Sequence, residues 1–316
     1  MIHFFCSYSF SQDRQLATLQ HGADLQVFYG LSAFKSAMAA AVDGDIITLS
    51  AGTFTSENIT KAVTIQGAGY VNDPANGRFM TNLSGNLSIV LPEGAKGMKI
   101  EGINTNNVVS VGKATEFIFK RCRFQELRFT AQSVNCQVLQ CRVYHLYPDE
   151  SSENLLLKNS VIDQLHNNGD NAMLLAENCV FTSRNANYNY PSYNTTVVTY
   201  KNCIVYFPSL SSSSIAYNSI SWNSFSASVQ QNAVSGLDLG ANVIEGNFDW
   251  ESPLKLKADA ATKYIGTDGT QVGIYGGTTP FTDIPSNPQI KSKEIAAQTD
   301  ENGKLSVKIT VEAQND

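Results

Sequence analysis

Residues 117–127 (FIFKRCRFQEL), 136–146 (CQVLQCRVYHL) and 155–165 (LLLKNSVIDQL) repeat one pattern at an interval of nineteen residues. Each segment has a central position that we call the anchor, with apolar residues five and three positions before it and two positions after it. At this fixed spacing the anchors are Ile103, Cys122, Cys141, Ser160 and Cys179. Ala68 counts as an earlier anchor, and Cys203 and Ser219 follow at irregular spacing. Self-similarity at such a period is typical of a solenoid, in which every repeat buries its apolar side against its neighbours.

The alternation of apolar residues divides each repeat into strands. Positions −5 and −3 alternate with period two, as in a β-strand, and so do the anchor and position +2. The step from −3 to the anchor is odd, so a sharp bend must lie at position −1, where Gly and Asn most easily adopt a left-handed backbone. That position holds Gly67, Gly102, Asn159, Asn178, Asn202 and Asn218, with Arg121 and Gln140 as exceptions.

A second break in the alternation leads to inward-facing Leu127, Leu146 and Leu165, five positions after the anchors. Three short strands per repeat predict the rung of a parallel β-helix. A leucine-rich repeat is the alternative at this period, but its leucine-dense consensus and its helix in every repeat are missing. Ahead of the repeats, residues 32–42 (SAFKSAMAAAV) predict an amphipathic helix with Ser32 as its N-cap. This helix is expected to cover the open end of the solenoid.

Residues 44–70, GDIITLSAGTFTSENITKAVTIQGAGY, carry two motifs directly after this helix. The first reads G-D-x-I-x-L-x-x-G-x-[FY], and the second reads V-T-I-x-G-x-G. Helix and motifs together resemble the opening of the pectate-lyase-like right-handed parallel β-helix proteins. The resemblance covers about residues 24–250 and implies a right-handed parallel β-helix, without implying any one activity. The chain looks like a non-catalytic member of that group.

We therefore predict an all-β chain in three parts: an N-terminal tail or signal remnant over 1–20, a capping helix with the parallel β-helix over 21–285, and a C-terminal β-hairpin over 286–316. The first dozen residues, MIHFFCSYSFSQ, are apolar and aromatic but lack the basic start of a secretory signal. Extracellular location is therefore expected mainly from the resemblance, because such β-helices usually act outside the cytoplasm.

The repeat pattern fades after residue 250. Residues 272–288 (VGIYGGTTPFTDIPSNP) are rich in Gly and Pro and predict a connecting loop that folds over the last rung. Leu305, Val307, Ile309 and Val311 then alternate with polar residues and predict the second strand of the hairpin. Two strands alone are only marginally stable, so the hairpin should pack on the solenoid or on a partner.

Composition restricts the partners. A net charge of −6 and a pI near 5.3 argue against nucleic-acid binding, which requires a basic face. No run of eighteen apolar residues exists, so no membrane span is expected. Cysteines occupy four anchors, Cys122, Cys141, Cys179 and Cys203, and serine replaces them at other anchors. This exchange favours buried free thiols over disulfides, and the clustered Cys and His spacing of a metal site is missing.

The register of the repeats predicts one candidate ligand site on the outside of neighbouring rungs. The residues beside the inward leucines that we call the surface patch are Glu126, Arg128, His145, Tyr147 and His166. The longer repeat after the fifth anchor adds Tyr188, Tyr190 and Tyr193. Aromatic faces beside charged groups suit sugars, which offer apolar faces and hydroxyl rims. An ordinary polar surface is the alternative. Histidines near their reference pKa would make binding change between about pH 5 and pH 8.

Two classes of enzyme with the resembled fold have recognisable catalytic residues. Polysaccharide lyases pair an Arg or Lys base with carboxylates that bind calcium, and the outward columns here contain no stack of carboxylates. Pectin hydrolases carry N-T-D, D-D and R-I-K motifs, whereas this chain has Asn104-Thr105-Asn106 and neither of the other two. Catalysis is therefore not established. If there is any, a lyase is favoured over a glycoside hydrolase.

We predict an extracellular or cell-surface protein that binds or presents a polysaccharide without a cofactor. A lyase acting on a uronate polymer, with calcium, is one alternative, and a structural or adhesive spacer is another.

Overall fold

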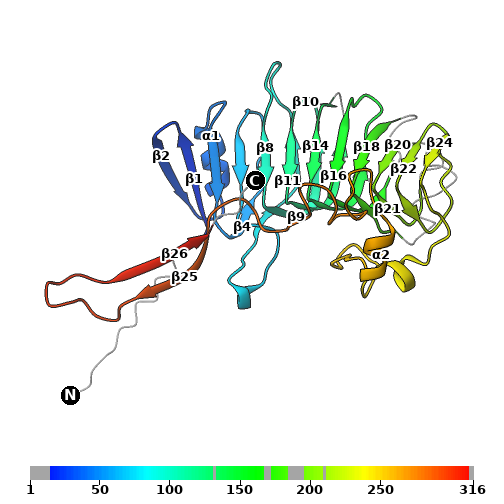
Figure 1. Ribbon diagram of the computed structural model, residues 1–316. Coiled ribbons are helices and arrows are strands. Elements are labelled where there is room, and N and C mark those ends of the chain that lie inside the picture. Colours follow the sequence, from blue (N-terminus) through cyan, green and yellow to red (C-terminus); the bar gives the residue numbers. More distant parts are fainter. Residues whose placement is uncertain (1–14, 131–132, 167–171, 184–195, 209–210, 313–316) are drawn as a thin grey trace, which may run out of the picture.

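The nineteen-residue repeats stack as rungs of a parallel β-solenoid (Figure 1). The computed structural model describes residues 15–130, 133–166, 172–183, 196–208 and 211–312. Two long sheets run along the solenoid, and over these residues the first has twelve strands and the second ten. The prediction of an all-β parallel solenoid is confirmed.

The first sheet consists, in spatial order, of β2 (Asp24–Tyr29), β1 (Leu16–His21), β3 (Ile46–Leu49), β5 (Thr64–Gln66), β8 (Lys99–Glu101), β11 (Ile118–Lys120), β14 (Gln137–Leu139), β16 (Leu155–Lys158), β18 (Met173–Glu177), β20 (Val197–Lys201), β22 (Ile215–Tyr217) and β24 (Val229–Gln231). The second sheet consists of β23 (Ile220–Ser221), β21 (Ile204–Val205), β19 (Val180–Phe181), β17 (Val161–Leu165), β15 (Arg142–Tyr147), β12 (Arg123–Phe129), β9 (Ile103–Val111), β6 (Thr81–Ser84) and β4 (Gly52–Thr55), with β7 (Leu87–Ile89) also paired to β9. A short third sheet pairs β10 (Ala114–Thr115) with β13 (Ser133–Val134). Strand β1 pairs antiparallel with β2 and β3, so regular structure begins inside the range predicted as a tail.

The predicted register is confirmed. Phe119 lies opposite Val138 in the first sheet, and the three inward leucines of the second sheet align from rung to rung. These columns are buried, with Phe119, Leu127 and Leu146 all 0% exposed. Burying one such side chain contributes about 1.5–3 kcal/mol relative to leaving it in water, so the inward columns are a main source of stability.

The left-handed bends also lie where the pattern placed them. Asn159, Asn178 and Asn202 have φ of 46°, 52° and 58°, and the two exceptions, Arg121 and Gln140, adopt the same conformation at 51° and 53°. A second column of bends, at Glu116, Asn135 and Asn154, precedes the first sheet on three rungs. These three residues were not singled out by the apolar pattern.

Gly67 is an exception with a different physical reason, because it does not share the positive φ of the bend column. A Cβ on Gly67 would lie 2.4 Å from the carbonyl oxygen of Gly102. The glycine is therefore required by the close approach of two backbones.

The anchor column forms a ladder of hydrogen bonds between rungs. The backbone N–H of Cys122 donates to Sγ of Cys141 at 3.4 Å, and the N–H of Cys141 donates to Oγ of Ser160 at 3.1 Å. Cys203 donates in the same way to Ser219 at 3.0 Å. A small side chain with an acceptor atom is needed here, which explains the exchange of cysteine and serine. The described cysteines are buried free thiols, in agreement with the prediction.

Helix α1 (Ala33–Ala40) packs its apolar face on the first rungs, with Phe34 and Ala37 fully buried. Ser32 occupies the N-cap position, but its side chain makes no capping hydrogen bond, unlike the prediction. At the C-terminal end of the helix, the Lys61 ammonium donates to three carbonyl oxygens, those of Met38, Ala39 and Ala41, at 2.6–3.0 Å. No helix of the described residues is long and apolar enough to cross a membrane.

Residues 237–264, which we call the outer layer, cover the far rungs of the second sheet and contain a π-helical turn (Leu239–Val243) and α2 (Ala258–Lys263). They form a second apolar core with outward side chains of the sheet. The sheet contributes Val161, Val180, Ile204 and Ile220, each one position after an anchor. On the two preceding rungs the same position holds Arg123 and Arg142. The change from arginine to aliphatic residues along this column indicates that another part of the chain covers the surface there.

Residues 265–288, which we call the strap, run back along the solenoid instead of folding over its last rung as predicted (orange in Figure 1). The bend column holds the strap in place. Asn218 donates to the carbonyl of Ile265 at 2.9 Å, and Asn159 donates to those of Ile274 and Gly276 at 2.9 and 2.8 Å. Outward amides at the left-handed bends therefore serve as anchoring points for a later part of the chain.

The near end of the strap is held by a buried carboxylate. Glu101 accepts hydrogen bonds from the backbone N–H of Ser286 at 2.9 Å and from its hydroxyl at 2.5 Å, and forms ion pairs with Lys99 and Arg121. Burial alone would raise the pKa of Glu101, but the bonds from Ser286 and the charge of Lys99 outweigh it and lower the pKa.

Strands β25 (Gln289–Ile295) and β26 (Val307–Glu312) form the predicted C-terminal hairpin, which extends away from the solenoid in Figure 1. Asp300 fixes its turn by accepting from the N–H groups of Asn302 and Lys304 at 2.9 and 2.8 Å. Val307 and Ile309 remain 52% and 53% exposed, so the expected packing of this face on the solenoid is not found within the described residues.

Candidate functional site

The five residues of the surface patch lie together on the outer side of β12 and β15 and directly after the end of β17. Glu126 is paired in register with His145, and Arg128 with Tyr147, on the next rung. The Arg128 guanidinium forms an ion pair with Glu126 and lies 4.6 Å from the centre of the Tyr147 ring. The grouping that the repeat register predicted is therefore present in the structure.

Three side chains of the patch form a ladder along the rung-stacking direction. The Tyr147 ring stacks on the His166 ring with centroids 4.2 Å apart and an interplanar angle of 7°. Arg128 contacts the same tyrosine ring from the preceding rung. Because its neighbours stack on it, Tyr147 offers its edge and hydroxyl more than an open face to a ligand.

The two histidines contact each other directly. Nδ1 of His145 lies 2.9 Å from Nε2 of His166, so one ring donates and the other accepts. Burial lowers the pKa of His166 to about 4, and the neighbouring His145 contributes to this. Burial also lowers the pKa of His145, against the opposing charges of Glu126 and Asp163. The expectation of a pKa near the reference value therefore fails for His166, and the pKa of His145 also lies below its ordinary value.

Tyr188, Tyr190 and Tyr193 lie outside the described residues, so their placement relative to the patch stays a prediction.

The patch continues into a set of aromatic rings that the repeat analysis did not include. Tyr144 contacts His145 edge-on with centroids 4.4 Å apart, and on its other side it lies 5.0 Å from the Trp250 ring of the outer layer. The Arg123 guanidinium lies 4.6 Å from the Trp250 centroid. Trp250 therefore links the patch to a second feature, a pocket beside it.

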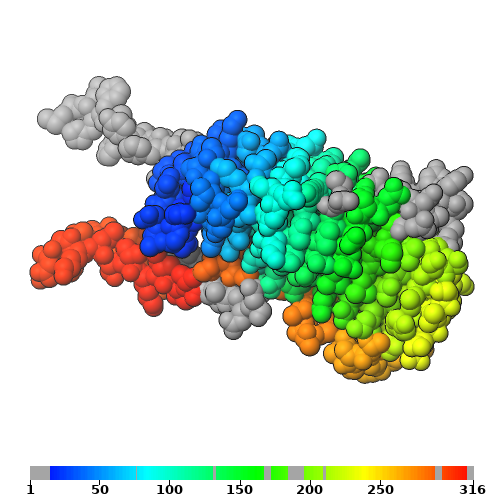
Figure 2. All heavy atoms as spheres, turned by 90° about the horizontal axis from the view of Figure 1, so that it is seen from above, coloured from blue at the N-terminus to red at the C-terminus, as the bar shows by residue number. Residues whose placement is uncertain are grey.

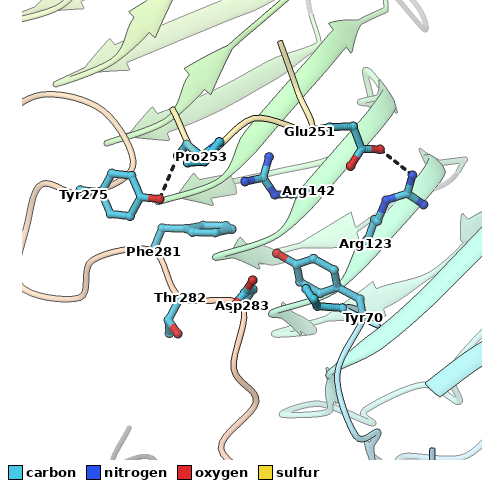
Figure 3. Close-up of a pocket in the computed structure, with 10 residues that line it drawn as sticks. Tyr70, Arg123, Arg142, Glu251, Pro253, Tyr275, Phe281, Thr282 and Asp283 are labelled. Carbon is cyan, nitrogen blue, oxygen red and sulfur yellow. Dashed lines mark hydrogen bonds and ion pairs between the residues drawn. The ribbon is translucent and has the colours of Figure 1, made fainter. Parts of the chain in front are cut away.

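This pocket, which we call the strap pocket, is a cavity of about 520 Å³ between the second sheet and the strap (Figure 3). It is lined by Tyr70, Val71, Arg123, Arg142, Glu251, Pro253, Tyr275, Phe281, Thr282 and Asp283. The walls come from five separate stretches of the chain, which explains why no single segment of the sequence identifies the pocket.

Arg142 is the most deeply buried cation of the pocket, at 8% exposure. Its Nη1 donates to the carbonyl oxygen of Trp250, its Nη2 donates to that of Ser252 at 3.0 Å, and Phe281 lies 5.2 Å from the guanidinium. Among the described residues no carboxylate forms an ion pair with it. Its side chain is therefore held rigidly while its charge is left uncompensated.

The carboxylates of the pocket are already committed to other cations. Asp283 forms an ion pair with Arg78 at 2.8 Å, and Glu251 forms one with Arg123 at 2.8 Å. When Arg78, which pairs with Asp283 from outside the lining, is counted, these two pairs cancel and the charge of Arg142 remains unbalanced.

Tyr70 is 6% exposed, and its hydroxyl finds no partner with hydrogen-bond geometry within the described part of the chain. Figure 3 shows its ring reaching into the space between Arg142 and Asp283. Burial raises the pKa of Tyr70 strongly, and the Arg142 guanidinium opposes this rise through its charge and through its close approach to the hydroxyl oxygen. The hydroxyl therefore stays protonated and is available as a donor.

Sequence reasoning missed the strap pocket, although one signal was present. Arg123 and Arg142 occupy the same column, one position after successive anchors, where the later rungs carry aliphatic residues. Within the described residues, no group of three or more His, Cys, Asp or Glu side chains could hold a metal ion. No protein-family model matches the chain, and no curated protein or solved structure matches it either.

Proposed function

We propose that this chain is an extracellular or cell-surface protein of the right-handed, pectate-lyase-like kind of β-helix, and that it binds a polysaccharide on the outer face of its second sheet without catalysing a reaction. The observation that carries this proposal is the row of aromatic rings from Trp250 through Tyr144 and the two histidines to Tyr147. The motifs at 44–70 and the confirmed register support the placement among such β-helices.

The chemistry of the row suits a neutral, hydroxyl-rich ligand. Imidazole nitrogens and the Tyr147 hydroxyl offer donors and acceptors at fixed positions, while Tyr144 and Trp250 contribute apolar surface. The rings pack on one another at 4.2–5.0 Å, so few side-chain rotamers remain to be lost when a ligand binds. A preorganised surface of this kind binds with a smaller entropic cost than a set of mobile side chains.

A glycan-array screen of the purified protein, followed by calorimetric titration of each hit, tests the proposal. We expect Tyr144→Ala to weaken binding of a confirmed glycan by about ten-fold, on the scale of an aromatic contact and its buried area. Tyr217→Ala is the matched control, because Tyr217 is a half-buried tyrosine on the outer face of the first sheet.

Equal losses in the two variants, or an array without any hit, would contradict carbohydrate binding by this face. An absorbance rise from unsaturated uronate product, dependent on calcium, would instead identify a lyase.

A further inference from the structure

The strap pocket contains a positive charge that no carboxylate of the described residues balances. Of the two arginines that line it, Arg123 has a carboxylate partner in Glu251, and Arg142 has backbone carbonyls only. Taking a cation out of water is costly unless its charge is balanced, and carbonyl dipoles balance it only in part. A single negative charge would complete the pocket.

Beside this cation lies a second unsatisfied group, the Tyr70 hydroxyl. Leaving a buried hydroxyl without a partner costs stability, and native proteins rarely do so without a reason such as a ligand. Tyr70 and Arg142 come from different rungs, yet Figure 3 shows both side chains directed to one space. A protonated phenol and a guanidinium are both donors, so together they fit an acceptor that carries negative charge.

The size of the cavity narrows the class of anion. A volume of about 520 Å³ is far larger than an inorganic ion needs and lies in the usual range for small organic ligands. Phe281 and Tyr275 supply apolar walls, and the Thr282 side chain adds a polar group. We propose that the strap pocket binds a small organic monocarboxylate, with the carboxylate group held by Arg142 and Tyr70.

This proposal does not depend on carbohydrate binding by the surface patch. The carboxylate can belong to a free organic acid or to an acidic sugar, and probes of both kinds distinguish these sources. Because the pocket lies between the sheet and the strap, an occupant contacts both. We therefore expect binding to stabilise the folded protein by mass action, which gives a readout independent of any activity.

The test is thermal unfolding of the full chain at constant ionic strength with sodium acetate, benzoate, glucuronate, sulfate or neutral glucose. We expect a saturable rise in Tm with at least one of the three carboxylates and no saturable rise with sulfate or glucose. A larger effect of benzoate indicates a free aromatic or aliphatic acid, and a larger effect of glucuronate indicates an acidic sugar.

Tyr70→Phe is the decisive variant, because it removes a hydroxyl that has no partner of standard hydrogen-bond geometry among the described residues. We expect it to unfold at the same temperature as the parent, or slightly higher, and to bind the carboxylate about ten-fold or more weakly, as for a lost hydrogen bond to a charged group. Tyr200→Phe is the matched control, because Tyr200 is a buried tyrosine of the solenoid core that does not line the pocket. It should leave the carboxylate affinity within about two-fold of the parent.

Three results would overturn the proposal: no saturable effect of any carboxylate on the parent, an equal effect of sulfate, or unchanged affinity in Tyr70→Phe. The surface-patch variant Tyr147→Ala separates the two proposed sites. It should lose glycan affinity and keep the carboxylate effect.

Discussion

Replacing Asn159 tests whether the bend column holds the strap. Its side chain is fully buried and donates to the carbonyls of Ile274 and Gly276, and its own backbone is left-handed with φ of 46°. Losing two hydrogen bonds costs about 2 kcal/mol net. Alanine in a left-handed conformation costs about 1 kcal/mol more. We therefore expect Asn159→Ala to lower the free energy of unfolding by about 3 kcal/mol.

Two further variants separate the contributions. Glycine adopts the left-handed bend without steric strain, so Asn159→Gly should cost about 2 kcal/mol, the hydrogen-bond part alone. Asn154→Ala is the control for the bend, since Asn154 has φ of 56° on the same repeat and its side chain donates to exposed Asn135. It should cost about 1 kcal/mol.

The measurement is urea unfolding followed by far-ultraviolet circular dichroism and by tryptophan fluorescence, with linear extrapolation to water. Coincident transitions by the two probes are needed before free energies are compared. If Asn159→Gly unfolds at the parent's urea midpoint, the strap is not held by this amide, and the reasoning about the bend column is refuted.

Three other perturbations give equally definite expectations. NMR titration should place the pKa of His166 near 4, and glycan affinity should stay constant from pH 6.5 to 8. Because the folded state favours the neutral ring, the contribution of His166 to stability falls as pH drops from about 6.5 toward 4. A titration midpoint near 6.5 would contradict the burial argument. The pKa of Glu101 is lowered in the folded state, so its contribution to the free energy of unfolding is present above the pKa of the unfolded state and is lost as pH falls through the pKa of the folded state. Glu101→Gln should unfold more easily than the parent at pH 7, and the difference in unfolding free energy should narrow in acid. A difference that does not change with pH would contradict this. Leu146→Asp should cost several kcal/mol by placing a charge in the core, measurable by the same urea experiment, and a cost below about 1 kcal/mol would show that this column does not face inward.

The repeating part of the fold could be predicted from the sequence because each position recurs in the same environment. One apolar column therefore predicts the next, as Leu127 predicts Leu146, and a residue type at a bend reports a backbone conformation. The same register grouped Glu126, His145 and His166 correctly. Their proton affinities were not predictable, because burial of an imidazole depends on which neighbours close over it.

The positions of the strap and the outer layer do not follow from the repeat. Both segments contact the solenoid through single, non-repeating interactions, such as Ser286 with Glu101, and a pattern seen once carries no periodic signal. The aliphatic stretch of the column after the anchors shows that a surface is covered but not by which segment. Trp250 and Tyr70 were missed for this reason, since each reaches its site only through segments whose positions are set by tertiary contacts.

The return of the strap also determines the order in which the fold can be completed during synthesis. Rungs can stack as soon as they leave the ribosome, because each contacts only its neighbours. The outward aliphatic stripe through Val180 and Ile220 must wait for residues up to Phe281, which come sixty-one positions after Ile220. At typical elongation rates that delay is about 3–12 s, far longer than stacking of a rung requires. Until then the nascent solenoid carries a hydrophobic stripe that is at best partly covered, the kind of surface that chaperones bind and that joins unfinished chains to one another.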